Sequence, residues 1–113
     1  MPRLHANLLR GTLDLLILRA LEGGRRHGYG ILEWLEHTVA PELLIEEGTL
    51  YPALHRLEAE GWIRAEWGAS ENNRKAKYYR LTPRGTKRAK SESSAFRAYA
   101  EKVIRALDEA VTP

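Results

Sequence analysis

The chain has 113 residues, of which 43% are hydrophobic and 29% charged, and this composition excludes a wholly disordered protein. It contains no cysteine, which excludes a disulfide framework, an iron–sulfur cluster and a zinc site built on thiolates. The net charge of +3 is unevenly distributed, because residues 71–90 hold eight Lys and Arg side chains against one acid, Glu71. This concentration favours a polyanionic partner, although a solvated basic face accounts for the charge alone equally well.

The N-terminal part predicts a short arm and then a central helix. The arm spans residues 1–10, where Leu4 and Leu8 lie one helical turn apart and are candidate contacts to a second copy. The helix is expected over 12–22, capped by Thr12 and apolar on nearly every face, which is typical of a core helix. Its apolar run is too short for a membrane span, and it contains Asp14 and Arg19 and lacks a small-residue cleavage site, so it does not resemble a signal peptide. We therefore expect no membrane association and a soluble, cytoplasmic protein.

A second helix is predicted over 29–38, with Pro41 marking the end of that region. The short apolar piece at 43–45 could form a single edge strand. A third helix is expected over 49–60, with Thr49 as its cap, so that Pro52 falls in the first turn, where its missing N–H costs little. The side chains expected to face inward from this third helix are Leu50, Ala53, Leu54 and Leu57.

The hydrophobic period then changes from 3.6 to 2. Residues 62–67 alternate, residues 76–81 form a second run of strand character, and the polar segment 68–75 separates them. This pattern predicts a β-hairpin whose long loop projects as a flexible, basic finger.

The last helix begins with Thr82 as cap and Pro83 as first residue, and could extend to Ala110. Such a helix is longer than a small domain is wide. Its apolar stripe is made of Ala89, Ser93, Phe96, Ala100, Val103, Leu107 and Ala110, widened by Tyr99 and Ile104. Pairing with a second copy would cover this stripe, and the alternative is a helix folded back over its own domain.

The order of helix, helix, short strand, helix, hairpin and long helix is that of an α+β, mainly helical, winged helix-turn-helix. The expected units are a winged-helix DNA-binding domain over 1–82 and a C-terminal dimerisation helix over 83–113. The alternative architecture is another small α+β body whose basic hairpin is merely surface.

Four segments resemble the PadR family of transcriptional regulators, in family order. They are residues 10–18 (RGTLDLLIL), 27–31 (HGYGI), 46–58 (EEGTLYPALHRLE) and 74–85 (RKAKYYRLTPRG). The C-terminus, with a single helix, is similar to the compact subgroup. The resemblance implies a bacterial homodimeric repressor that binds imperfect inverted repeats and is released by small aromatic molecules.

Candidate contacts to double-stranded DNA lie on the third helix, the start of the second helix and the hairpin. A recognition helix presents its N-terminal side chains to base edges, and basic wing residues suit phosphates and the minor groove. For Tyr51 and Tyr29 the alternative is an aromatic packing role, and for His55 an ordinary surface position. The candidates are Tyr29, Thr49, Tyr51, Pro52, His55, Arg56, Asn73, Arg74, Lys75 and Lys77.

A dimer interface is expected along the last helix and the arm. Its candidates are Leu4, Leu8, Phe96, Tyr99, Ala100, Val103, Ile104 and Leu107. A pocket for a planar aromatic effector could be lined by Phe96 and Tyr99, although both could simply fill the interface. Drug-binding members of the family use a tryptophan in the last helix, whereas all three tryptophans here lie elsewhere.

Other functions have less support from the residues. No catalytic constellation, phosphate-cradling glycine loop or nucleophilic cysteine is present, which excludes an assignable enzyme and cofactor. The four histidines are scattered without metal-ligand spacing, so a metal site is not expected. The alternative function is a metal- or ligand-sensing dimeric helical adaptor.

Overall fold

A computed structural model describes residues 2–39 and 45–113, with side-chain positions from residue 11 onward. The described chain is a mixed α+β fold that is mainly helical, as the sequence predicts. Its elements in order are α1 (Pro2–Leu21), β1 (Arg26–His27), α2 (Gly28–Thr38), α3 (Glu47–Ala59), β2 (Ile63–Ala69), β3 (Lys75–Leu81) and α4 (Pro83–Asp108).

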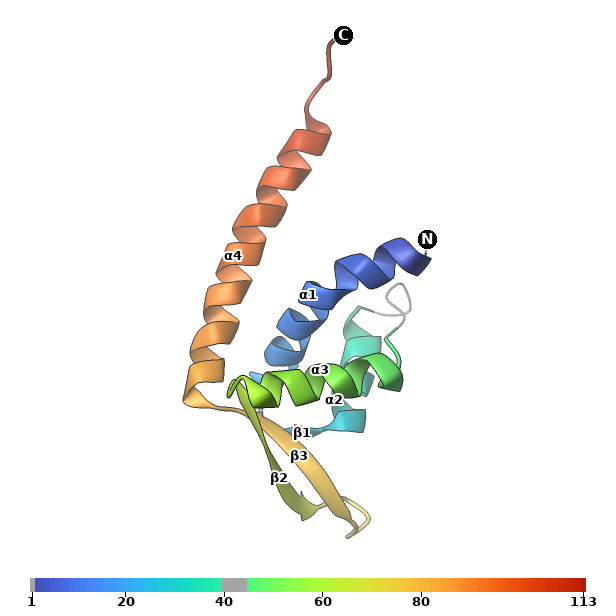
Figure 1. Ribbon diagram of the computed structural model, residues 1–113, viewed down its shortest axis with the longest axis vertical. Coiled ribbons are helices and arrows are strands. Elements are labelled where there is room, and N and C mark those ends of the chain that lie inside the picture. Colours follow the sequence, from blue (N-terminus) through green and yellow to red (C-terminus); the bar gives the residue numbers. More distant parts are fainter. Residues whose placement is uncertain (1, 40–44) are drawn as a thin grey trace.

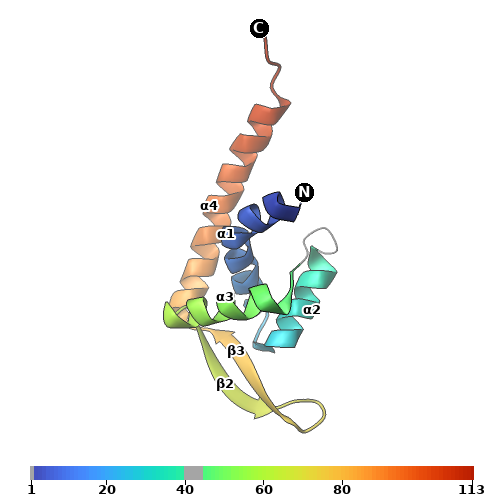
Figure 2. The same cartoon turned by 45° about the vertical axis from the view of Figure 1, so that its right-hand side comes forward.

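The described chain is elongated, with principal extents of 64 × 30 × 21 Å. Helices α1, α2 and α3 gather above the sheet, the β2–β3 hairpin projects from one end, and α4 extends from the other (Figure 1). The same arrangement is seen after rotation, where α3 crosses the body between α1 and the hairpin (Figure 2). The hairpin tip and the free end of α4 therefore lie at opposite ends of the molecule.

The core lies where the three short helices meet the root of the sheet. The predicted inward stripe of the third helix is confirmed, because all four of its side chains are buried. Burial of such side chains is the main stabilising contribution in a domain of this size. The largest fully buried side chains are Ile17, Leu18, Ile31, Leu35, Leu50, Leu54, Leu57 and Ile63.

The three strands form one antiparallel sheet in the order β1-β3-β2. The predicted hairpin is confirmed, with a register from Ile63 opposite Leu81 to Ala69 opposite Lys75. The third strand is β1, which the sequence analysis missed because a two-residue strand shows no periodicity. Of the predicted edge strand at 43–45, residues 43 and 44 lie outside the described residues, and Ile45 is buried without belonging to a strand.

Two predicted helix caps are wrong. Thr12 does not begin the first helix, because α1 is continuous from Pro2 and the preceding leucines and alanine favour helix as well. Thr49 does not cap the third helix, because α3 begins at Glu47 and the Glu46 carbonyl accepts from the Thr49 and Leu50 amides. Pro52 consequently lies inside α3 rather than in its first turn, where it removes one helical hydrogen bond.

The start of α4 agrees with the sequence prediction. The Thr82 hydroxyl accepts from the Gly85 amide at 3.0 Å and donates to the Gly61 carbonyl at 2.7 Å, with Pro83 as the first helical residue. Gly85 is buried against the backbone of Trp62, whose carbonyl also accepts from the Thr82 amide. The junction between hairpin and long helix is thus fixed by backbone packing, and α4 ends at Asp108 rather than at Ala110.

The hairpin loop is tighter than predicted. Both strands extend further than expected, so only residues 70–74 form the turn. The Ser70 amide donates to the Arg74 carbonyl at 2.8 Å, and the Asn73 amide donates to the Ser70 carbonyl at 2.9 Å. Asn73 has a φ of 57°, in the left-handed region that asparagine tolerates. The loop is therefore a hydrogen-bonded turn at the end of a long hairpin.

Candidate nucleic-acid interface

Helix α3 presents most of its predicted DNA contacts to solvent. Thr49, Pro52 and His55 are exposed, and Tyr51 retains 39% of its surface. Helix formation alone separates these residues from the buried leucines, because the two sets occupy different faces at 3.6 residues per turn. Glu47 lies in the first turn of α3, where a carboxylate is favourable beside the helix dipole.

Arg56 is held differently from the other α3 candidates. Its guanidinium forms a charged hydrogen bond with the Asp14 carboxylate of α1, and both side chains are partly covered. This ion pair joins the recognition helix to the central helix. A contact between Arg56 and DNA would have to share or replace the Asp14 partner.

The ring of Tyr51 packs against Gly28, the first residue of α2. A Cβ added at Gly28 would lie 2.6 Å from the Tyr51 hydroxyl and 2.8 Å from the ring, so only glycine leaves room for it. Burial, with Glu47 and Tyr79 nearby, raises the pKa of the Tyr51 hydroxyl. The hydroxyl therefore keeps its proton at neutral pH and remains a hydrogen-bond donor.

The start of α2 is fixed by His27, which caps it. The Gly30 amide donates to His27 Nδ1 at 2.8 Å, and the imidazole ring lies 5.6 Å from the ring of Tyr78 on β3. Tyr29 follows the cap and is 59% exposed, so it is not a packing residue of the described chain. The exposed Tyr29 hydroxyl at this helix N-terminus has the chemistry of a phosphate contact.

The wing carries its predicted cations on the turn and on β3. Asn73, Arg74 and Lys75 are exposed, whereas Lys77 is half-buried with its Nζ 5.6 Å from the centre of the Tyr79 ring. Tyr79 is itself buried beside Tyr51. Tyr51 thus joins α3 to the start of α2, and α3 also packs on β2 at the root of the wing.

Two residues of this region were missed in the sequence analysis. Arg25 stacks over the Tyr78 ring at 4.2 Å and pairs with Glu66 at 3.2 Å, which anchors the chain before β1 to the hairpin. Trp67 lies on the wing and is 61% exposed. The alternation of residues 62–67 puts Trp67 on one side with Ile63 and Ala65, but Ile63 is buried whereas Trp67 lies further along the hairpin and is exposed.

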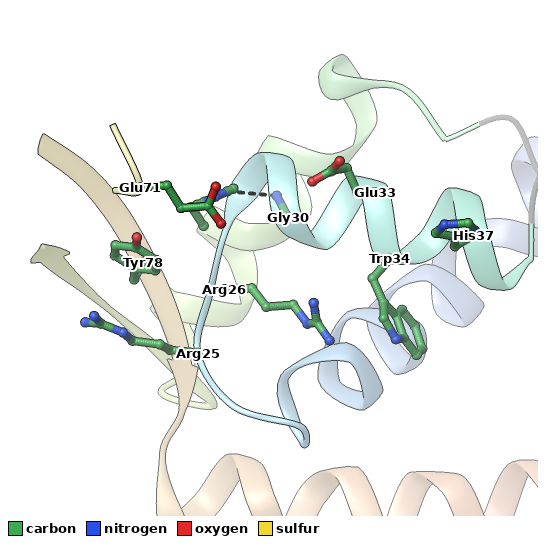
Figure 3. A pocket seen from close by; sticks show the side chains of 9 residues that line it. Arg25, Arg26, Gly30, Glu33, Trp34, His37, Glu71 and Tyr78 are labelled. Carbon is green, nitrogen blue, oxygen red and sulfur yellow. Dashed lines mark hydrogen bonds between the residues drawn. The ribbon is translucent and has the colours of Figure 1, made fainter. Parts of the chain in front are cut away.

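A hollow of about 460 Å³ lies between α2 and the wing (Figure 3). Its walls include Trp34 and His37 of α2, Arg26, and Tyr78 of β3. The Arg26 Nε already donates to the Ala20 carbonyl at 3.0 Å. Within the described ranges no group of three or more His, Asp or Glu side chains is arranged to hold a metal ion.

Helix α4 carries the predicted dimer contacts on an uncovered face. Its stripe begins with Ala89, which is buried against the body as Gly85 is one turn earlier, and continues into large side chains that are exposed in the single chain. These are Phe96 (43% exposed), Tyr99 (65%), Val103 (39%), Ile104 (57%) and Leu107 (79%), with Ala100 half-buried among them. The side chains of Leu4 and Leu8 lie outside the described residues.

Three helices packed on a small sheet, with an exposed third helix and a basic hairpin beside it, define a winged helix-turn-helix protein. Residues 17–91 match the model of the transcriptional regulator PadR-like family. Because this match covers more than half of the chain, the chain belongs to the PadR-like family. Members of this family are transcriptional regulators rather than enzymes.

Individual relatives agree with this assignment. A transcriptional regulator of Mycobacterium tuberculosis is 31% identical over 96 residues, covering 84% of this chain and 85% of its own. The crystal structure of a PadR-like transcriptional regulator from Bacillus cereus superposes with a TM-score of 0.83 at 25% identity, covering 92% and 99% of the two chains. A regulator from Clostridium thermocellum gives 0.78 at 33% identity, covering 91% and 96%. None of the helices in the described ranges combines the length and apolar character of a membrane span.

Proposed function

We propose that the chain is a homodimeric, sequence-specific repressor that binds an inverted-repeat operator in double-stranded DNA and acts in the cytoplasm. Residues 1–82 form its DNA-binding domain, with residues 1–10 as an arm, and residues 83–113 form its dimerisation helix. The observation that carries the proposal is an α3 whose candidate side chains are exposed, packed against the start of α2 through Tyr51 and Gly28, with a basic hairpin beside it.

This arrangement has the components of groove recognition. The exposed N-terminal side chains of α3 can reach base edges, while Tyr29 and the wing cations can hold phosphates. The exposed recognition helix adds little positive charge, because Glu47 and Glu58 lie in it and Arg56 is paired with Asp14. Most of the electrostatic attraction to DNA therefore comes from the wing.

The dimer is supported by the uncovered stripe of α4. This helix is 26 residues long, which corresponds to about 39 Å, and its outer half lies beyond the body. Large apolar side chains in one line on a helix are stabilised when a second helix packs on them. A two-fold dimer would present two recognition surfaces, which suits an inverted repeat.

An aromatic effector is the remaining part of the proposal. Phe96 and Tyr99 are exposed on α4 of the single chain, so a pocket lined by both requires walls from the second copy. A ligand bound there would act by favouring a different spacing of the two recognition surfaces. A ligand at this site would therefore change DNA binding without touching the DNA.

Arg74→Ala is expected to weaken DNA binding by loss of one phosphate contact at the wing turn. The logarithm of the association constant should fall less steeply with the logarithm of salt concentration, by about 0.9 for each lost phosphate contact on duplex DNA. The measurement is fluorescence anisotropy of a labelled duplex taken from upstream of the chain's own gene, titrated between 50 and 200 mM salt. Arg97→Ala, on α4 away from the wing, serves as the matched control. Equal slopes for both variants would contradict the assignment.

Gly28→Ala is expected to weaken DNA binding by displacing Tyr51. The added Cβ would meet the end of the tyrosine ring, which can swing outward because it is half exposed, so stability should fall only modestly. Loss of a groove contact corresponds to about tenfold in affinity. A double variant with Tyr51→Ala should bind no more weakly than Tyr51→Ala alone, since both changes remove the same contact. Additive losses in the double variant would show that the two residues act separately.

A further inference from the structure

The wing carries an exposed tryptophan that the proposed contacts do not use. Trp67 lies on β2 and is 61% exposed, and the Lys75 Nζ lies 5.0 Å from the centre of its ring. The other two tryptophans are partly buried and pack against the hydrophobic core. An indole left in water on a projecting hairpin points to a partner, because its large apolar surface is favourable only when covered.

The strand register shows which face of the wing holds this indole. Trp67 is opposite Lys77, and the residues on the same face nearer the root are Ala65 and Tyr79, then Ile63. Ile63 and Tyr79 are buried in the core beside α3. The face of Trp67 is therefore the outward continuation of the surface on which α3 lies. Glu66 belongs to the opposite face, where it pairs with Arg25 and Arg80.

Charge identifies the partner that this face fits. Trp67 is flanked by Lys75 above its ring and by Lys77 across the strand pair, and among the described residues of β2 and β3 no acidic side chain lies on this face. Aromatic rings between cations suit nucleic acid, because the ring covers sugars and base edges while the cations meet phosphates. A second copy is a poorer occupant, because the uncovered stripe of α4 lies at the opposite end of the molecule from the wing (Figure 1).

We infer that Trp67 is a DNA-contacting residue of the wing, which packs against the sugar-lined wall of the groove beside the site read by α3. The inference rests on the proposed function and assigns different contributions to the lysines and to Trp67. Lys75 and Lys77 supply attraction that salt screens. Trp67 supplies contact that salt does not screen, since removing apolar surface from water depends weakly on ionic strength.

The test compares Trp67→Ala with Lys75→Ala in the full chain. The probe is the same labelled upstream duplex, titrated at several salt concentrations. Trp67→Ala should weaken binding roughly tenfold at every salt concentration with an unchanged slope, the loss expected for one aromatic–nucleic-acid contact. Lys75→Ala should lower the slope by about 0.9 instead. Trp67→Phe should fall between wild type and Trp67→Ala, because the smaller ring keeps part of the contact.

A second readout follows the indole directly. The difference in fluorescence between wild type and Trp67→Phe is the emission of Trp67. Acrylamide should quench this emission in the free protein, and saturating duplex should protect Trp67 from quenching. Melting temperatures of all variants should match wild type, since the side chain is exposed. The proposed function fails if wild type binds no duplex at low salt. This inference alone fails if wild type binds the duplex, Trp67→Ala binds it equally well, and acrylamide still quenches Trp67 in the wild-type complex. A changed oligomeric state with unchanged DNA affinity would assign Trp67 to a protein contact and overturn it.

Discussion

Gly85→Ala is expected to destabilise the fold by about 3 kcal/mol or more, the range of a severe overpacking substitution. A Cβ at position 85 would overlap the Trp62 carbonyl oxygen and lie 2.8 Å from its carbon. These are backbone atoms, and the same carbonyl accepts from the Thr82 amide, so neither partner can move without breaking the α4 start. Such a loss is a large part of the 5–15 kcal/mol that a domain has in total.

The measurement is chemical denaturation followed by circular dichroism. Gly48→Ala is the matched control, because nothing lies within 4 Å of a Cβ at that position and α3 is helical there. It should leave stability unchanged or slightly higher. A Gly85→Ala variant as stable as Gly48→Ala would show that the hairpin and α4 are joined less tightly than the structure indicates.

Ile104→Asp is expected to convert the proposed dimer to monomer. The side chain is 57% exposed on the stripe of α4, and a carboxylate there would have to be buried without a partner in the paired helices. DNA affinity should fall at least a hundredfold. In a dimer, binding of one subunit raises the effective concentration of the other at the second half-site, and a monomer loses this effect. Sedimentation velocity gives the oligomeric state, and anisotropy gives the affinity.

Ala98→Asp adds the same charge away from the stripe, since at about 100° per residue position 98 lies about 120° around α4 from Ile104 and about 160° from Phe96. This control should remain dimeric and bind DNA as wild type does. Dissociation by both substitutions would indicate that negative charge, rather than the stripe, disrupts the assembly. If both variants remain dimeric, the interface does not include the stripe at Ile104.

Hydrophobic periodicity predicted the helices, the hairpin and the long last helix, because these depend on which side chains must leave water. The boundaries of α1 and α3 were less predictable. Threonine is a common cap, but it is also tolerated within helices, so Thr12 and Thr49 gave a misleading signal. The β1 strand depends on pairing with β3, which is a tertiary contact that a two-residue segment cannot reveal.

The candidate site was partly predictable for similar reasons. Exposure of Tyr51 and His55 follows from helical spacing relative to the buried leucines. The pairing of Arg56 with Asp14 does not, because the two residues are far apart in sequence and meet only through the packing of α1 on α3. Alternation groups Trp67 with Ile63 on one face, but the exposure of Trp67 depends on how far the strands extend beyond the core.

The β1 strand has a mechanical consequence. It pairs with β3 at Arg26 and His27, and His27 also caps α2, so the root of the wing and the start of α2 are joined by consecutive residues. The two regions proposed to contact DNA, the start of α2 and the root of the wing, are therefore held at a fixed separation and cannot move independently. If the contact points on the DNA do not match this separation, the duplex rather than the protein has to deform. We accordingly expect preferred binding sequences to differ in how easily they bend or narrow at positions that no side chain touches.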